Sequence, residues 1–96
     1  MIGIYAERGP RCRLYVEGHA EAGADRDAVC AGVSALTGAL LQYADQIGAR
    51  YLRYDMQRGE VFFSCPRAGA WFELVLQGLS AIAARYPAHV KISVLG

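Results

Sequence analysis

Apolar and polar side chains alternate near the start of the chain. Positions 2–7 show this alternation, and its period of two is typical of a half-buried strand. Gly9-Pro10 then marks a turn. Positions 11–17 alternate in the same way and end at Gly18-His19. The pattern predicts two strands joined as a hairpin.

Further along the chain, the spacing between apolar residues changes from two to three or four positions. After a loop from Ala20 to Arg26, apolar residues recur at helical spacing and predict an amphipathic helix of about four turns; they are Val29, Val33, Leu36, Leu40 and Ala44. Asp27 is expected as its N-cap and Gly48 as its stop. Several other positions are small, such as Gly32, which allows another backbone to approach closely. The uncharged run within this helix is short for a membrane span and contains polar residues, so we expect a buried helix.

Strand and helix patterns alternate through the second half. The residues predict a third strand at Tyr51–Asp55, a turn at Gln57–Gly59, a fourth strand at Glu60–Cys65 stopped by Pro66, a second helix from Trp71 to Tyr86-Pro87, and a last strand at His89–Val94. The expected order is ββαββαβ. This order predicts an α+β fold: a mixed sheet with two helices packed on one face, forming a single domain over residues 1–96.

Composition narrows the class of protein. Apolar residues make up 54% of the 96 residues, which favours a folded core. The net charge is +1, with ten basic and nine acidic residues spread along the chain. Direct binding to nucleic acid is therefore not expected, since it usually needs a basic stripe. The three cysteines have no paired spacing and the start lacks a signal peptide, which predicts a cytoplasmic protein without a membrane anchor.

A histidine and a cysteine occupy the two ends of the loop between the hairpin and the first helix. His19 ends a strand, and Cys30 would be the third helical residue if Asp27 is the N-cap. Unpaired N–H groups and the helix dipole favour a thiolate at such a position. An imidazole within reach could take the thiol proton. Position alone favours a plainer interpretation, in which Cys30 is a small buried residue and His19 is an exposed turn residue.

Other polar residues are candidates for supporting roles. Asp27 could cap the helix or orient His19, and capping is favoured. Ser34 lies one turn after Cys30, where it could hydrogen-bond near the sulfur or, more routinely, back to the helix backbone. His89 is a second candidate base but is expected to be exposed.

The remaining cysteines, histidines and glycines give no indication of a cofactor or metal site, and none is expected. Cys12 and Cys65 are expected to be structural. The cysteines and histidines lack the spacing of metal ligands, and no glycine-rich phosphate loop follows a strand. The arginines and tyrosines between Arg50 and Arg58 could contact a polyanion, but a solvated sheet face is the favoured interpretation.

Two segments together resemble a known family. Gly18-His19-Ala20 is followed by Asp27-x-Val29-Cys30-Ala31-Gly32-Val33-Ser34-Ala35-Leu36. This pair of segments resembles the signature of the ribosomal-processing cysteine protease family called Prp. The resemblance extends to chain length and to the order of elements on each side. The sequence departs from the family pattern at Glu21 and Ala28.

The resemblance implies a function and a partner. It implies a cytoplasmic, homodimeric endopeptidase that removes the N-terminal extension of a large-subunit ribosomal protein. His19 would be the base and Cys30 the nucleophile, with Asp27 and Ser34 as supporting residues. A mobile loop at Ala20 to Arg26 is also implied.

The mechanism adds expectations for substrate contacts. Gly18, Ala20 and Ala31 would contact the substrate, and the backbone N–H groups of Cys30 and Ala31 would hold the oxyanion. Two alternatives remain open. One is a non-catalytic α+β module that binds ribosomal protein or RNA, and the other is a redox-sensing thiol at Cys30.

Overall fold

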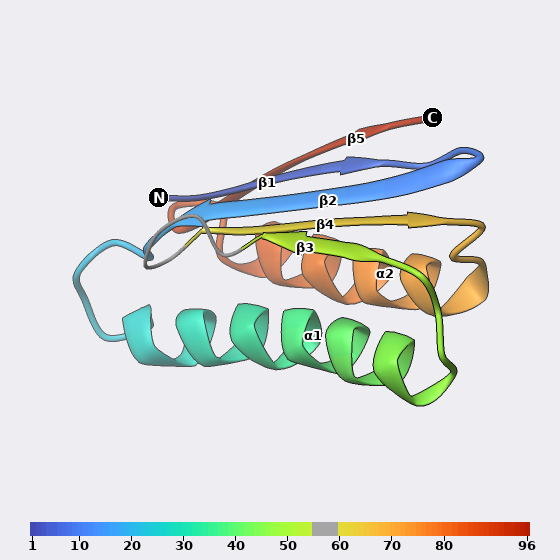
Figure 1. The fold of residues 1–96 in the computed structure, drawn as a ribbon. Coiled ribbons are helices and arrows are strands. Elements are labelled where there is room, and N and C mark those ends of the chain that lie inside the picture. The colour runs from blue at the N-terminus through green and yellow to red at the C-terminus, as the bar shows by residue number, and fades with distance from the viewer. Residues whose placement is uncertain (55–59) are drawn as a thin grey trace.

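The computed structural model describes residues 1–54 and 60–96 and contains one sheet with two helices (Figure 1). The elements are β1 (Ile2–Glu7), β2 (Arg11–Gly18), α1 (Arg26–Gln46), β3 (Leu52–Tyr54), β4 (Val61–Pro66), α2 (Ala70–Arg85) and β5 (Val90–Leu95). Both helices cover the same face of the sheet (Figure 1). The predicted ββαββαβ order and the α+β class are confirmed.

The sheet has five strands in the order β3-β4-β2-β1-β5. The predicted hairpin is confirmed, because β1 pairs with β2 in antiparallel register from Ile2–Gly18 to Glu7–Arg13. β1 also pairs with β5 in parallel, which makes the sheet mixed. On its other side, β2 pairs with β4, and β4 pairs with β3, which is an edge strand. Both of these pairings are antiparallel. This order places the end of β2, with Gly18, beside the start of β1.

The core lies between the sheet and the two helices. The alternating positions of β1 and β2 supply one side of it, as the period of two predicted. Phe63 of β4 is fully buried and makes ring contacts with Tyr51, Trp71 and Phe72. These aromatic contacts join the edge of the sheet to α2. None of the helices in the described part of the chain is both long and apolar enough to span a membrane.

Glycines let the two helices pack closely. A Cβ at Gly78 of α2 would lie 2.8 Å from Cδ2 of Leu36, and one at Gly32 of α1 would lie 3.1 Å from Cδ1 of Ile82. The expected close neighbour of the small residue Gly32 is therefore a side chain of α2, and no backbone atom of another described element lies within 3.1 Å of that position.

The first helix differs from its prediction at both ends. It runs for 21 residues, well beyond the expected four turns, and its N-cap is Asp25 instead of Asp27. The helix starts early because the backbone carbonyl of Asp25 accepts the first helical hydrogen bond from Val29, and no side chain caps it. Gly48 does end the helix: its φ is 68°, and Gly48 and Ala49 donate to carbonyls in the last turn, as in a Schellman motif.

The later strands also shift from their expected bounds. Tyr51 precedes β3, and Asp55 and the expected turn at 57–59 lie outside the described residues. Glu60 is not in β4, whereas Pro66, predicted to stop the strand, is its last residue. Pro66 is tolerated there because a strand end does not need its missing N–H, and Arg67 donates to the Pro10 carbonyl instead.

Candidate active site

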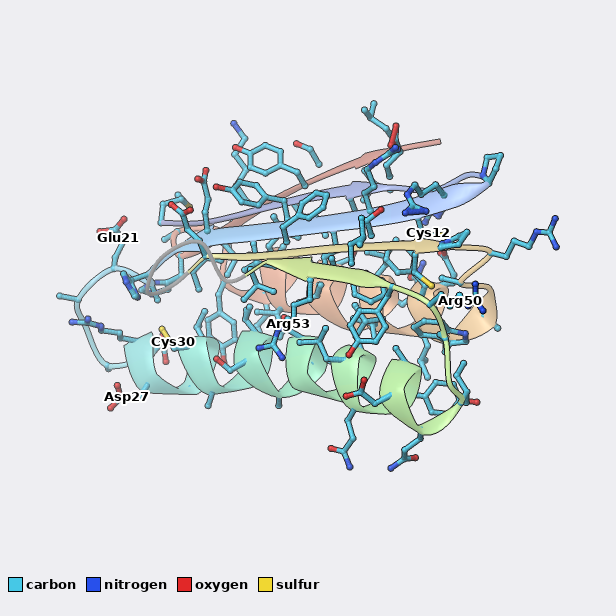
Figure 2. The ribbon with its side chains drawn as sticks, in the orientation of Figure 1. Cys12, Glu21, Asp27, Cys30, Arg50 and Arg53 are labelled. Atoms are coloured by element: carbon cyan, nitrogen blue, oxygen red, sulfur yellow. The ribbon has the colours of Figure 1, made fainter. Side chains whose placement is uncertain are left out.

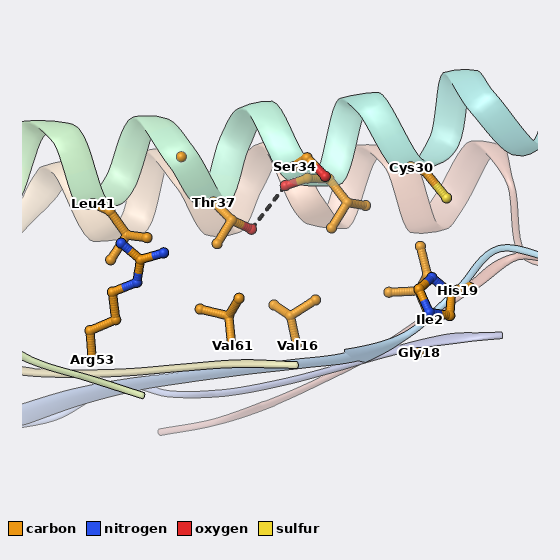
Figure 3. Close-up of a pocket in the computed structure, with 12 residues that line it drawn as sticks. Ile2, Val16, Gly18, His19, Cys30, Ser34, Thr37, Leu41, Arg53 and Val61 are labelled. Carbon is orange, nitrogen blue, oxygen red and sulfur yellow. Dashed lines mark hydrogen bonds between the residues drawn. The ribbon is translucent and has the colours of Figure 1, made fainter. Parts of the chain in front are cut away.

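A cleft of about 310 Å³ lies between α1 and the sheet (Figure 3). One wall comes from the strands and the other from one stripe of α1. Its lining residues are Ile2, Val16, Gly18, His19, Cys30, Val33, Ser34, Thr37, Gly38, Leu41, Arg53 and Val61. The cleft therefore joins His19 and Cys30 to a largely apolar channel that follows α1.

His19 reaches this cleft because the chain turns sharply at the end of β2. Gly18 has a φ of 88°, a region that favours glycine, and a Cβ there would collide with the Met1 carbonyl oxygen. The turn ends the strand at Gly18 and leaves the His19 side chain exposed. Glycine is thus required at this position by both conformation and space.

Cys30 lies on the α1 side of the same end of the cleft, and its side chain extends toward the sheet (Figure 3). It is half-buried. Because α1 begins at Arg26, Cys30 lies in the second turn, so its predicted place as the third helical residue is wrong. The N–H groups of Cys30 and Ala31 are consequently used by the helix itself, which argues against the oxyanion role expected of them.

The cysteine and the histidine share the cleft without a direct bond. In the part of the chain that the structure describes, no hydrogen bond joins the His19 imidazole to the Cys30 thiol. Catalytic hydrogen bonds are often long in the absence of substrate and tighten in the complex. The fold thus brings the His19 imidazole and the Cys30 thiol to one end of one cleft, from elements on opposite sides of the loop.

The two residues expected in supporting roles, Ser34 and Asp27, lie on different sides of α1. Ser34 lines the cleft one turn after Cys30, with an exposed side chain. Asp27 lies in the first turn of α1 and points away from the sheet (Figure 2). The predicted N-cap role of Asp27 is wrong, and its position on the outer side of the helix does not favour contact with His19.

The expected substrate contacts are only partly placed in the cleft. Gly18 lines it, whereas Ala20 is buried and Ala31 is exposed, and neither belongs to the lining. The loop carries an ionic contact, because the Glu21 carboxylate lies 2.6 Å from the Met1 ammonium group. This contact lowers the pKa of Glu21, mainly through the hydrogen bond. The same ammonium group donates to the His19 carbonyl at 2.7 Å.

Several cleft residues were not predicted from the sequence. Thr37 and Leu41 continue the stripe of Cys30 and Ser34 at helical spacing, a signal that the sequence contains. Thr37 is buried, and its hydroxyl donates to the Val33 carbonyl at 2.8 Å. Arg53 was interpreted as part of a solvated sheet face, but it lines the cleft. No local pattern could have placed it there, because its position depends on sheet order.

The remaining cysteines and the second histidine lie outside the cleft. Cys12 and Cys65 are opposite each other on β2 and β4 and are buried, which agrees with structural roles. Burial, the largest cause, raises the pKa of the Cys65 thiol. His89 was expected to be exposed but is half-buried against Tyr86, and its Nδ1 is buried without a hydrogen bond. Among residues 1–54 and 60–96, no cluster of three or more acidic, histidine or cysteine residues could hold a metal ion.

Comparison with solved structures finds the same fold. The S. aureus ribosomal processing protease Prp in complex with a substrate peptide has a TM-score of 0.82 and 20% identity, covering 98% of this chain and 99% of that chain. The same protease with a covalently linked product peptide gives 0.83 and 20%, with the same coverage. SMU.848 from Streptococcus mutans gives 0.76 and 22%, covering 99% of this chain and 94% of its own.

Comparison at the level of sequence identifies the family. No curated protein matches the chain significantly. The family model described as cysteine protease Prp matches residues 1–91, which include every residue of the cleft. The chain belongs to the cysteine protease Prp family.

Proposed function

We propose that this protein is a cysteine endopeptidase that removes the N-terminal extension of a large-subunit ribosomal protein. The observation that carries the proposal is the cleft, which has a thiol and an imidazole at one end and apolar walls along α1. An extended peptide fits such a channel. The S. aureus structures that share the fold contain a ribosomal processing protease with peptides, which supports this substrate class.

In the proposed mechanism, His19 takes the proton from the Cys30 thiol and the thiolate attacks the peptide carbonyl carbon. The tetrahedral intermediate collapses as the C–N bond breaks, and the His19 imidazolium donates its proton to the leaving amine. Water, deprotonated by His19, then hydrolyses the thioester and restores the thiol. The N–H groups of Asp27 and Ala28, which precede the first acceptor that the helix offers to Val29, are the proposed oxyanion donors.

The other site residues take supporting roles in this proposal. Gly18 presents its backbone to the peptide, and Ser34 lines the cleft one helical turn after the attacking Cys30. Asp27 supports the start of α1. The loop from Ala20 to Arg26 closes over the peptide and brings its backbone toward the bound chain. Ala31, which is exposed on α1, is a further proposed contact. The proposed enzyme is cytoplasmic and homodimeric and needs no cofactor.

The direct test is cleavage of the ribosomal precursor protein. We expect the wild type to release the extension, and Cys30→Ala and His19→Ala to lower the rate by at least about 10³-fold, as for other nucleophile–base pairs. Cys12→Ala is the matched control, because that thiol is buried outside the cleft. Undiminished cleavage by either active-site variant would exclude the proposed roles. Binding of the precursor without cleavage by the wild type would favour the non-catalytic module.

A further inference from the structure

Gly38 is a glycine of α1 that helix packing does not explain. Glycine inside a helix is less stable than alanine, because its backbone loses more conformational freedom on folding. At Gly32 and Gly78 a side chain of the other helix lies close to the place that a Cβ would take. At Gly38, no described atom outside its own part of the helix lies within 4 Å of that place. The space beside Gly38 is therefore open, and the described chain does not fill it.

This open space belongs to the cleft. Gly38 is one of the lining residues, and helical spacing places it on the stripe of α1 that also carries Cys30 and Ser34. Gly32 and Gly78, whose neighbours account for them, do not line the cleft. The glycine without a packing role is thus the one that borders the proposed peptide site.

The walls around this space are mainly apolar. Val16 and Val61 are opposite each other in register on β2 and β4 and form the strand side of the cleft (Figure 3). Leu41 lies on the helix side, and the Thr37 hydroxyl is already bonded to a carbonyl of its own helix. Arg53 also lines the cleft, but it already has an interaction within the chain and is not a free charge. The surroundings therefore suit an apolar side chain.

The helix sets the distance of this space from the thiol. Cys30 and Gly38 are eight positions apart, which is about 12 Å along α1 at 1.5 Å per residue. An extended peptide advances about 3.3 Å per residue, so a peptide lying along α1 covers this distance with about four residues. A peptide residue three or four positions from the scissile bond would then place its side chain beside Gly38.

We propose that Gly38 is a specificity-determining residue, whose missing side chain leaves room for a large apolar side chain about three or four residues from the scissile bond. The gain comes from apolar surface removed from water. We expect about a tenfold preference in kcat/KM for Leu over Ala at that peptide position. This inference rests on the proposed function, since it needs a peptide in the cleft.

The test compares synthetic peptides that carry the cleavage segment of the ribosomal precursor. Leu and Ala are exchanged at one position at a time, from two to six residues from the scissile bond on each side. The ratio of kcat/KM for the Leu and Ala peptides is measured at each position. We expect the wild type to prefer Leu about tenfold at three or four residues on one side.

Filling the space makes the test specific to one position of the helix. Gly38→Leu should reduce the Leu/Ala ratio at that peptide position to about one and leave the Ala peptide within about twofold of wild type. Gly38→Ala should reduce the ratio partly, and urea unfolding shows whether each variant is folded. Ala35→Leu is the matched control, because Ala35 is exposed on the same helix and does not line the cleft. This control should keep the wild-type ratio.

Three results would overturn the inference. The first is a wild-type ratio at every peptide position in both folded Gly38 variants. The second is an equal loss for Leu and Ala peptides, which would mean that the peptide backbone, and not a side chain, approaches Gly38. The third is the same change of ratio in Ala35→Leu.

A binding assay separates this inference from the proposed chemistry. The same peptides, labelled with a fluorophore, are titrated into Cys30→Ala, and the ratio of Kd values for Leu and Ala is measured with and without Gly38→Leu. If the wild type fails to cleave but this ratio still depends on Gly38, the chemistry is wrong and the recognition holds. If cleavage occurs without any dependence on Gly38, the recognition is wrong and the chemistry holds.

Discussion

The guanidinium of Arg8 donates two hydrogen bonds, each 2.7 Å long, to the two carboxylate oxygens of Glu73. Arg8 follows β1 and Glu73 lies in the first turn of α2, so the pair fastens the β1–β2 turn to the helix. The hydrogen bonds from Arg8, with a further one from Gln77, lower the pKa of Glu73 from 4.5 to about 2.

This pair predicts a pH-dependent contribution to stability. A carboxylate whose pKa is lower in the folded state stabilises the fold above its unfolded pKa, and the effect is lost as pH falls through the folded pKa. Glu73→Gln should therefore reduce the free energy of unfolding near pH 6, and the difference from wild type should shrink as pH falls from about 4.5 toward 2. Urea unfolding across that range measures it. The effect is modest because the two side chains are 40% and 41% exposed. A pH-independent difference would contradict the prediction.

Gly78 and Gly38 should respond oppositely to alanine. At Gly78 the new Cβ would meet Leu36 at 2.8 Å, so we expect Gly78→Ala to lower the free energy of unfolding by about 1 kcal/mol despite better helix propensity. At Gly38 nothing lies within 4 Å of the place that the new methyl group would take, so Gly38→Ala should stabilise by up to about 1 kcal/mol. Thermal or urea unfolding compares the two. Stabilisation by Gly78→Ala would mean that Leu36 moves aside without cost.

The three thiols should differ in their rates of alkylation. Cys30 is half-buried at the cleft, whereas Cys12 and Cys65 are 7% and 2% exposed. Burial also raises the pKa of Cys65, which lowers its thiolate fraction. Iodoacetamide at about pH 6 should label Cys30 first in the native protein, well below the ordinary thiol pKa of about 8.5. Mass spectrometry of the digested protein shows the order in which the three cysteines are alkylated. Labelling of Cys30 no faster than in the unfolded chain would favour the non-catalytic alternative.

Asp27 and His19 should behave as independent residues. Asp27 points away from the sheet and lies in the first turn of α1. A negative charge there interacts favourably with the helix dipole and stabilises the helix by about 0.3–1 kcal/mol. Asp27→Asn should therefore lower the unfolding free energy by that amount and shift the pH profile of kcat/KM little. A fall in kcat/KM of about 10²-fold or more would instead restore an orienting role toward His19.

Local signals in the sequence were sufficient for the order of elements and for the central pair of residues. Gly9-Pro10 marks the hairpin turn and Gly48 ends α1 because each acts through the conformation of its own backbone. His19 and Cys30 were found because they lie close together in the chain, on either side of one loop. The start of α1 was misplaced because the backbone carbonyl of Asp25, and no side chain, begins the helix.

The cleft itself was decided only by the tertiary structure. Arg53 lies 23 positions after Cys30, and it enters the cleft because β3 pairs beyond β4 at the edge of the sheet. His89 was expected to be exposed, yet packing against Tyr86 half-buries it. Periodicity reports which face of an element is apolar, but it carries no information about which neighbour covers that face. The sequence alone therefore determined the elements and the His19–Cys30 pair, whereas strand order and helix packing decided where the cleft runs and which charge lies at its far end.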